Sequence, residues 1–74
     1  MKKYKNSEEG GVSAFEISEN DIILEFKDGR KYLYNYLKPG KVHVEKMKIL
    51  AEADNGLTTY VNQHVRENYY KRIK

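Results

Sequence analysis

The chain of 74 residues contains no cysteine and no tryptophan, and it has a single proline. Without cysteine, neither a disulfide nor a zinc site built on thiolates can form. A domain of this length buries only about 60% of its unfolded surface, so each large apolar side chain matters for stability. The absence of cysteine also fits a reducing compartment, and we expect a cytoplasmic protein.

Long apolar runs are missing as well. No stretch approaches the ~20 apolar residues that are needed to span a bilayer, and no apolar segment follows the N-terminal lysines as it would in a signal peptide. We therefore expect a soluble protein without a membrane partner. The five glycines form neither a Walker nor a dinucleotide-binding pattern.

The sequence has little material for a catalytic or metal site. His43 and His64 are isolated, and all serines lie in the N-terminal quarter of the chain. No nucleophile, base and orienting group are suggested together. A domain of this size also rarely encloses a ligand pocket of several hundred Å³. We expect no enzyme, no cofactor and no metal.

Positive charge is unevenly distributed along the chain, although the net charge is only +3. Both ends are basic, whereas residues 6–37 are acidic on balance. Basic ends on a small domain suit a polyanion such as nucleic acid. They are also common as solubilising charge, so both interpretations stay open.

Three segments alternate apolar and polar residues with the period of a β-strand: VSAFEIS, DIILEFK and KYLYNYL. Turn residues separate the first two, and Asp28-Gly29, a strong hairpin signal, separates the second from the third. These segments predict a three-stranded antiparallel meander. Its last strand should carry Tyr32, Tyr34 and Tyr36 on one face.

After Pro39 and Gly40 the apolar period becomes helical. A first helix from residue 41 should bury Val44, Met47, Leu50 and Ala51, which recur at spacings of three and four. The sequence DNG should end this helix, with Gly56 in the left-handed cap position. Either Thr58 or Thr59 should then cap a second helix.

In the second helix an apolar residue recurs every four positions and should face the core: Val61, Val65, Tyr69 and Ile73. The chain thus predicts an α+β domain, in which a three-stranded antiparallel meander is followed by two helices packed on one face. This domain should comprise residues 12–74, and residues 1–11 should form a flexible N-terminal segment.

The polar side of the second helix is the candidate functional surface. On a helix, Asn62, Arg66, Tyr70 and Lys74 lie four residues apart and form one stripe. Such side chains contact phosphates or stack on bases. An ordinary solvated helix face is the alternative. His64 lies beside this stripe and is expected to be partly buried and hydrogen-bonded.

Several short motifs occur in a recognisable order: IILEF, the turn DG, YLY, a glycine, an aromatic residue, NQHVR, a tyrosine and KR. Through them the chain, from about residue 12 to residue 73, resembles the KTSC domain. This module is named for its occurrence at the C-terminus of some lysyl-tRNA synthetases, and family members also stand alone as small bacterial proteins. The resemblance implies a mainly structural role for Tyr32, Tyr34, Gly56 and Tyr69. It suggests nucleic-acid binding only through the company of a tRNA synthetase.

We therefore expect a small non-enzymatic module that binds RNA or another polyanion through the C-terminal helix. The candidate residues are Asn62, His64, Arg66, Tyr70, Lys71, Arg72 and Lys74. A protein-interaction or homo-oligomerisation module is the alternative, because an edge strand offers unpaired backbone groups to a partner. Neither the ligand nor the oligomeric state follows from the sequence.

Overall fold

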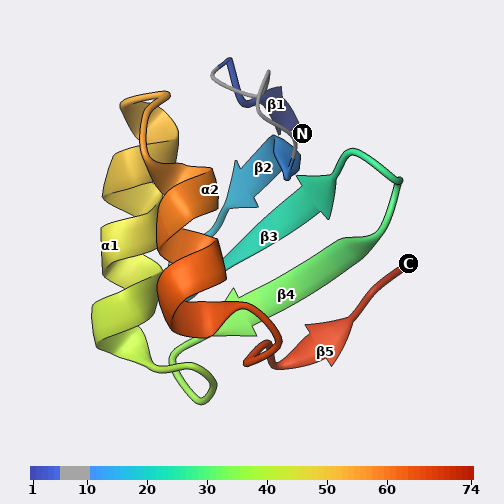
Figure 1. Ribbon diagram of the computed structural model, residues 1–74. Helices are drawn as coiled ribbons and strands as arrows, with labels where there is room; N and C mark the ends of the chain where they lie inside the picture. The colour runs from blue at the N-terminus through green and yellow to red at the C-terminus, as the bar shows by residue number, and fades with distance from the viewer. Residues whose placement is uncertain (6–10) are drawn as a thin grey trace.

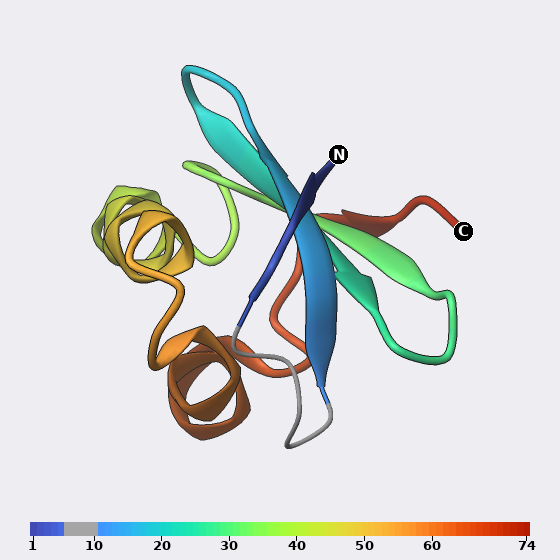
Figure 2. The ribbon, with the colours of Figure 1, turned by 90° about the horizontal axis from the view of Figure 1, so that it is seen from above.

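The computed structural model describes residues 1–5 and 11–74. Within them, an antiparallel sheet of five strands follows the order β1-β2-β3-β4-β5, and helices cover one of its faces (Figures 1 and 2). The predicted α+β class, with an antiparallel sheet and two helices, is confirmed. The prediction of three strands is wrong, because a short strand joins the sheet at each edge.

The central strands are the three that the alternation predicts: β2 (Val12–Ile17), β3 (Asp21–Phe26) and β4 (Lys31–Asn35). Phe15 lies opposite Leu24, and Leu24 lies opposite Tyr32. Directly opposed side chains point to the same face of a sheet. This row therefore faces the helices, and its neighbours along each strand face away from them.

Each edge strand consists of two basic residues. Strand β1 (Lys2–Lys3) pairs with β2, and strand β5 (Lys71–Arg72) pairs with β4. Two residues are too few to show a period of two, so the apolar pattern contains no signal for them. Lysine on an edge strand also discourages pairing with other chains.

The N-terminal residues are part of the fold. Tyr4 is only 1% exposed, and its backbone N–H donates to the Ser13 carbonyl at 2.9 Å. Its hydroxyl oxygen accepts the Leu57 backbone N–H at 2.9 Å, at the start of the second helix. Residues 2–4 of the segment predicted to be flexible thus pair and pack with the rest of the domain, and residues 6–10 of that segment lie outside the described residues.

Helix α1 (Lys41–Glu52) packs on the sheet through the predicted stripe. Val44, Met47 and Ala51 are buried, and Leu50 packs against the edge of this core. The spacing of apolar residues was sufficient to predict this helix and its buried side, because the helix contacts the sheet through one side only.

The turn between the helices differs from the prediction. The residue that takes the left-handed conformation directly after α1 is Asp54, with φ of 54°. Gly56 is also left-handed, with φ of 83°, but it is the residue that precedes helix α2 (Leu57–Tyr60). Neither Thr58 nor Thr59 caps this helix, because it begins before them and no side chain caps it.

The second helix is much shorter than predicted. Helix α2 continues into a π-helical turn, η1 (Val61–Val65), and then ends. Val61 and Val65 are buried, as their spacing predicts. Arg66 is not helical, and its carbonyl accepts a hydrogen bond from the Tyr34 hydroxyl at 3.2 Å. This contact from the sheet stabilises the bend at which the chain leaves the helix.

Beyond the bend the chain adds to the sheet. The Tyr70 backbone N–H donates to the Leu33 carbonyl at 2.7 Å, and the Ile73 N–H donates to the Lys31 carbonyl at 2.8 Å. These bonds satisfy backbone groups on β4 that would otherwise form an open edge. Tyr69 packs against the core from this segment, whereas Ile73 is 45% exposed and does not face the core.

The core lies between the sheet and the helices. Its fully buried members are Tyr4, Val12, Phe15, Ile22, Leu24, Tyr34, Val44, Met47, Ala51, Leu57, Val61 and Val65. Burial raises the pKa of the Tyr34 hydroxyl well above its ordinary value. No helix among the described residues has the length and apolar character needed to cross a membrane.

Candidate nucleic-acid interface

A cleft of about 480 Å³ opens beside the C-terminal part of the sheet. It lies where the β3–β4 hairpin, the start of β4, η1 and β5 come together. This volume is larger than the sequence-based argument from domain size allowed. The cleft is therefore the first place to look for a ligand.

All three arginines of the chain line this cleft: Arg30, Arg66 and Arg72. They come from three separate segments, namely the hairpin before β4, the bend after η1, and β5. Within the described part of the chain, none of the eleven lysines lines it. Guanidinium groups bind phosphate or carboxylate through two parallel hydrogen bonds, whereas an ammonium acts as a point charge. The cleft thus presents donors suited to such anions.

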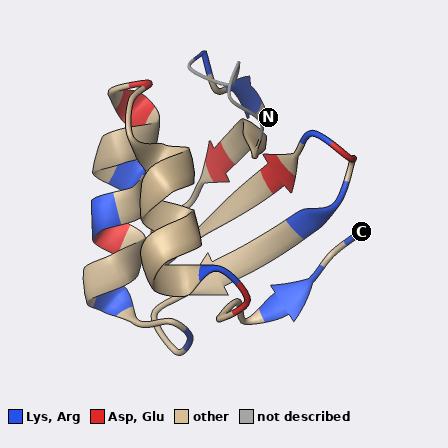
Figure 3. Ribbon diagram, in the orientation of Figure 1, with Lys and Arg blue, Asp and Glu red and all other residues tan. Residues whose placement is uncertain are grey.

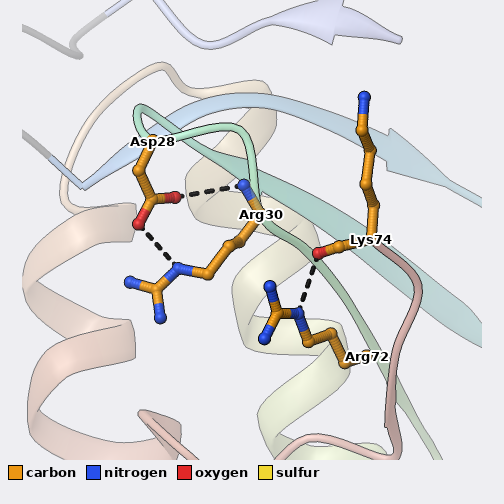
Figure 4. Close-up of polar contacts among 4 residues, drawn as sticks. All are labelled: Asp28, Arg30, Arg72 and Lys74. Carbon is orange, nitrogen blue, oxygen red and sulfur yellow. Dashed lines mark hydrogen bonds and ion pairs between the residues drawn. The ribbon is translucent and has the colours of Figure 1, made fainter.

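Two of the guanidinium groups are held in place by acceptors of the domain itself (Figure 4). Arg30 Nε donates to Asp28 Oδ2 at 2.6 Å, and Arg72 Nε donates to the Lys74 carbonyl at 2.9 Å. Each bond uses only Nε. The terminal nitrogens of both groups take no part in these two bonds, so they can turn to a ligand.

Arg30 and Asp28 each stabilise the charged form of the other. The Arg30 backbone N–H, at 3.0 Å from Oδ1, and its guanidinium lower the pKa of the Asp28 carboxyl. In turn, the hydrogen bond to the carboxylate raises the pKa of the guanidinium. Both side chains are exposed, so this pair orients Arg30 more than it stabilises the fold.

The remaining polar side chains of the cleft are Asn62, Arg66 and Glu67. Within the described residues, none of these three side chains forms a hydrogen bond or an ion pair. Glu67 is the one carboxylate among the residues that line the cleft, so positive charge is in excess there. Figure 3 shows the same asymmetry along the backbone: basic residues mark β5 and the start of β4, whereas β2 and β3 carry acidic residues.

Aromatic rings form one wall of the cleft. Tyr32 and Tyr69 stack with ring centres 4.3 Å apart, and Phe26 meets Tyr32 edge-on at 5.6 Å. The Arg72 guanidinium carbon lies 6.0 Å from the centre of the Tyr32 ring. Phenyl and guanidinium planes therefore lie next to each other, a combination that binds bases and phosphates together.

The predicted helical stripe does not exist. The helix ends at Val65, so Asn62, Arg66, Tyr70 and Lys74 do not lie on one helix face. The prediction failed because apolar residues still recur every four positions beyond the bend, at Tyr69 and Ile73, although the chain is no longer helical there. Asn62 and Arg66 meet Arg72 across the cleft instead, through the pairing of β5 with β4.

The other predicted residues lie elsewhere. His64 is exposed and lies beside Tyr60, outside the lining of the cleft. Tyr70 is 48% exposed and also lies outside this lining. Lys71 lies opposite Leu33, so it points to the face of the sheet away from the helices. Lys74 contributes its backbone carbonyl, which holds Arg72.

Sequence reasoning assigned Tyr32 and Tyr69 only a structural role, and it did not predict five further residues as part of the site: Gly11, Phe26, Arg30, Val61 and Glu67. Arg30 follows the Asp-Gly turn, and the hairpin signal alone brings it to the start of β4. Nothing in the sequence indicates that β5 pairs there as well.

In comparisons with known proteins, no family model, no curated protein and no solved structure matches this chain. The resemblance to the KTSC domain therefore stays a prediction. The site has to be interpreted from its own geometry.

Proposed function

We propose that the protein is a small module that binds single-stranded nucleic acid, with RNA as the expected polymer, and that the cleft holds one nucleotide. The observation that carries this proposal is the convergence of Arg30, Arg66 and Arg72 on one cleft with an aromatic wall. RNA is favoured over DNA by the resemblance to the KTSC domain.

The size of the cleft supports a single strand. Its volume of about 480 Å³ lies in the range of small-molecule sites and suits one nucleotide. Bases in a duplex are paired and stacked, so they cannot enter a cleft of this kind. Bases of a single strand are free to turn out and stack on a protein ring.

The residues divide into groups by chemistry. Arg30 and Arg72, whose Nε atoms are already held, would bind phosphate oxygens through their terminal nitrogens. The Arg66 side chain forms no hydrogen bond or ion pair among the described residues and would neutralise a second phosphate. The Asn62 amide would contact a base edge, and the ring of Tyr69 would stack.

The salt dependence of binding tests this proposal. We expect a fluorescently labelled RNA of ten nucleotides to bind at 50 mM salt with increased anisotropy. Three phosphate contacts on a single strand give a log–log slope of about −2, so affinity should fall about 20-fold between 50 and 200 mM salt. Absence of binding at 50 mM salt and tens of micromolar protein would refute the proposal.

Two matched variants separate the cleft from general charge. Arg66→Ala and Lys46→Ala each remove one positive charge, but Lys46 is exposed on α1 and outside the cleft. Arg66→Ala should weaken RNA binding about tenfold, because a hydrogen bond to a charged group is lost. Lys46→Ala should change it less than twofold. Equal losses in both variants would mean that RNA binds without the cleft.

A protein-interaction module is the second candidate, and exposed apolar side chains favour it. Leu37, Val42 and Ile49 are 81%, 80% and 63% exposed. Val42 and Ile49 are seven residues apart on α1 and thus share a face. Light scattering at increasing protein concentration distinguishes homo-oligomerisation from binding of another protein. A constant monomer mass would exclude self-association through this face.

A further inference from the structure

Away from the cleft, three side chains form a cluster between α1 and the segment of α2 and η1. They are His43 of α1, Tyr60 of α2 and His64 of η1. The ring centres are 5.9 Å apart for His43 and Tyr60, 4.5 Å for Tyr60 and His64, and 6.1 Å for the two histidines. The two histidines, isolated in the sequence, are thus neighbours in the fold.

One nitrogen of each imidazole is available to a ligand. His43 Nδ1 lies 2.7 Å from the Tyr60 hydroxyl oxygen, so this hydrogen bond uses Nδ1 and leaves Nε2. When Nδ1 carries the proton and donates it to the hydroxyl oxygen, Nε2 has a free lone pair. Within the described residues, the His64 ring has no hydrogen-bond partner, and its side chain is exposed.

The separation of the two rings fits shared coordination. In an imidazole complex the ring centre lies about 3.2 Å from the metal, because the metal–nitrogen bond is about 2.0–2.1 Å long. Two imidazoles on one metal therefore have ring centres about 5.2 Å apart at a tetrahedral angle and at most about 6.4 Å apart. The observed 6.1 Å lies near the upper limit and corresponds to a nitrogen–metal–nitrogen angle of about 145°, which is wider than the tetrahedral angle.

We propose that His43 and His64 together bind one divalent transition-metal ion, and that Tyr60 positions the first of them. Imidazole nitrogen is a preferred ligand of copper, nickel and zinc, and copper(II) should bind most tightly of the three. A hydrogen bond from the second ring nitrogen to an oxygen atom commonly orients a ligating histidine, and Tyr60 supplies this oxygen.

The site has two protein ligands. No group of three or more His, Cys, Asp or Glu side chains suited to a metal occurs among the described residues. Water or a second molecule would complete the coordination sphere. His64 lies in the last turn of η1, where the carbonyl ends of the backbone favour positive charge. This site is independent of the RNA proposal, since it shares no residue with the cleft.

Metal titration of four proteins tests this proposal. Copper(II) and nickel(II) are added to the wild type and to His43→Gln, His64→Gln and Tyr60→Phe, with binding followed by calorimetry. We expect one ion per chain in the wild type and at least a tenfold loss of affinity in each histidine variant. Tyr60→Phe keeps both ligands and should weaken binding about tenfold, because only the orienting oxygen is removed.

Electron paramagnetic resonance of the copper(II) protein supplies a second readout. Couplings from two imidazole nitrogens are expected in the wild type, and from one in His64→Gln, which replaces an exposed side chain and leaves the core intact. Circular dichroism of the metal-free variants verifies their fold. The proposal is refuted if no ion binds at 100 micromolar, or if the double variant His43→Gln/His64→Gln binds as the wild type does. The second result would assign the ion to another group, such as the N-terminal amine.

Discussion

The arginine cleft and the histidine cluster lie on opposite sides of one short helical segment. Asn62 and Arg66 point to the cleft, whereas Tyr60 and His64 point to α1. Each pair is separated by four residues, and the two pairs are offset by two residues, which is about half a turn of a helix. A segment of nine residues, with the bend that follows it, thus serves two surfaces of different chemistry.

The two surfaces differ in what holds their side chains. Two arginines of the cleft are oriented through Nε by a carboxylate and a backbone carbonyl, and the cleft itself requires β5 to pair with β4. The histidine cluster requires only that α1 packs against α2 and η1. Charge spread over a wide cleft suits a polyanion, whereas two imidazole rings in a small cluster suit a metal ion.

The largest effect is expected when each surface is disabled separately. The double variant Arg66→Ala/Arg72→Ala should lower RNA affinity at least 100-fold, because two charged contacts are lost. Its copper affinity should stay within twofold of the wild type. The double variant His43→Gln/His64→Gln should behave in the opposite way. Anisotropy and calorimetry measure the two affinities, and a double variant that lowers both would show that the surfaces are coupled.

A smaller effect is expected when the bend between the surfaces is weakened. Tyr34→Phe removes the hydrogen bond from the hydroxyl to the Arg66 carbonyl and should lower the free energy of unfolding by about 1 kcal/mol. RNA affinity should fall several-fold because Arg66 lies at this bend, whereas copper affinity should not change. Urea denaturation measures the first effect, and unchanged stability would mean that this bond does not hold the bend.

The same variant has a characteristic pH dependence. Burial raises the pKa of Tyr34 in the folded protein, so the unfolded chain loses this proton first as the pH increases. The stability that the neutral Tyr34 hydroxyl contributes is fully present below about pH 10, the ordinary tyrosine pKa, and decreases as the pH rises above it. Tyr34→Phe should therefore lose less stability than the wild type between pH 9 and pH 11 in the same urea experiment.

The smallest effect is expected from the carboxylate of the cleft. Glu67→Gln removes a negative charge beside the arginines and should raise RNA affinity about two- to threefold at 50 mM salt. The gain should become smaller at 200 mM salt, where exposed charges are screened. Glu52→Gln, an exposed residue of α1 outside the cleft, is the matched control and should leave the affinity unchanged. A decrease in Glu67→Gln would mean that this carboxylate contributes to binding.

Part of this architecture follows from local patterns. The alternation that buries Phe15 and Leu24, and the Asp28-Gly29 turn, predict the meander. The spacing of Val44 and Met47 predicts α1. These patterns are informative because a strand or a helix has to bury one face, and the period of its apolar residues marks that face.

The C-terminal segment shows where such patterns stop being sufficient. Val61, Val65 and Tyr69 continue one spacing, yet the helix ends after the second of them. The Tyr34 hydroxyl holds the carbonyl at the bend, and β4 offers unpaired backbone groups to the chain beyond it. Both partners are more than thirty residues away in the sequence, so no local window contains them.

The sequence by itself determined the α+β class, the central strands, α1 and the core side chains that these elements carry, because each of these depends on the period of neighbouring residues, whereas the burial of Tyr4 was not predicted. Only the tertiary structure decided that Arg30, Arg66 and Arg72 share a cleft and that His43 and His64 share a cluster. A periodic pattern shows which face of an element is buried, but it does not show which faces meet. Both sites form where faces of different elements come into contact. Hydrogen bonds and packing between segments that are distant in the sequence determine which faces make these contacts.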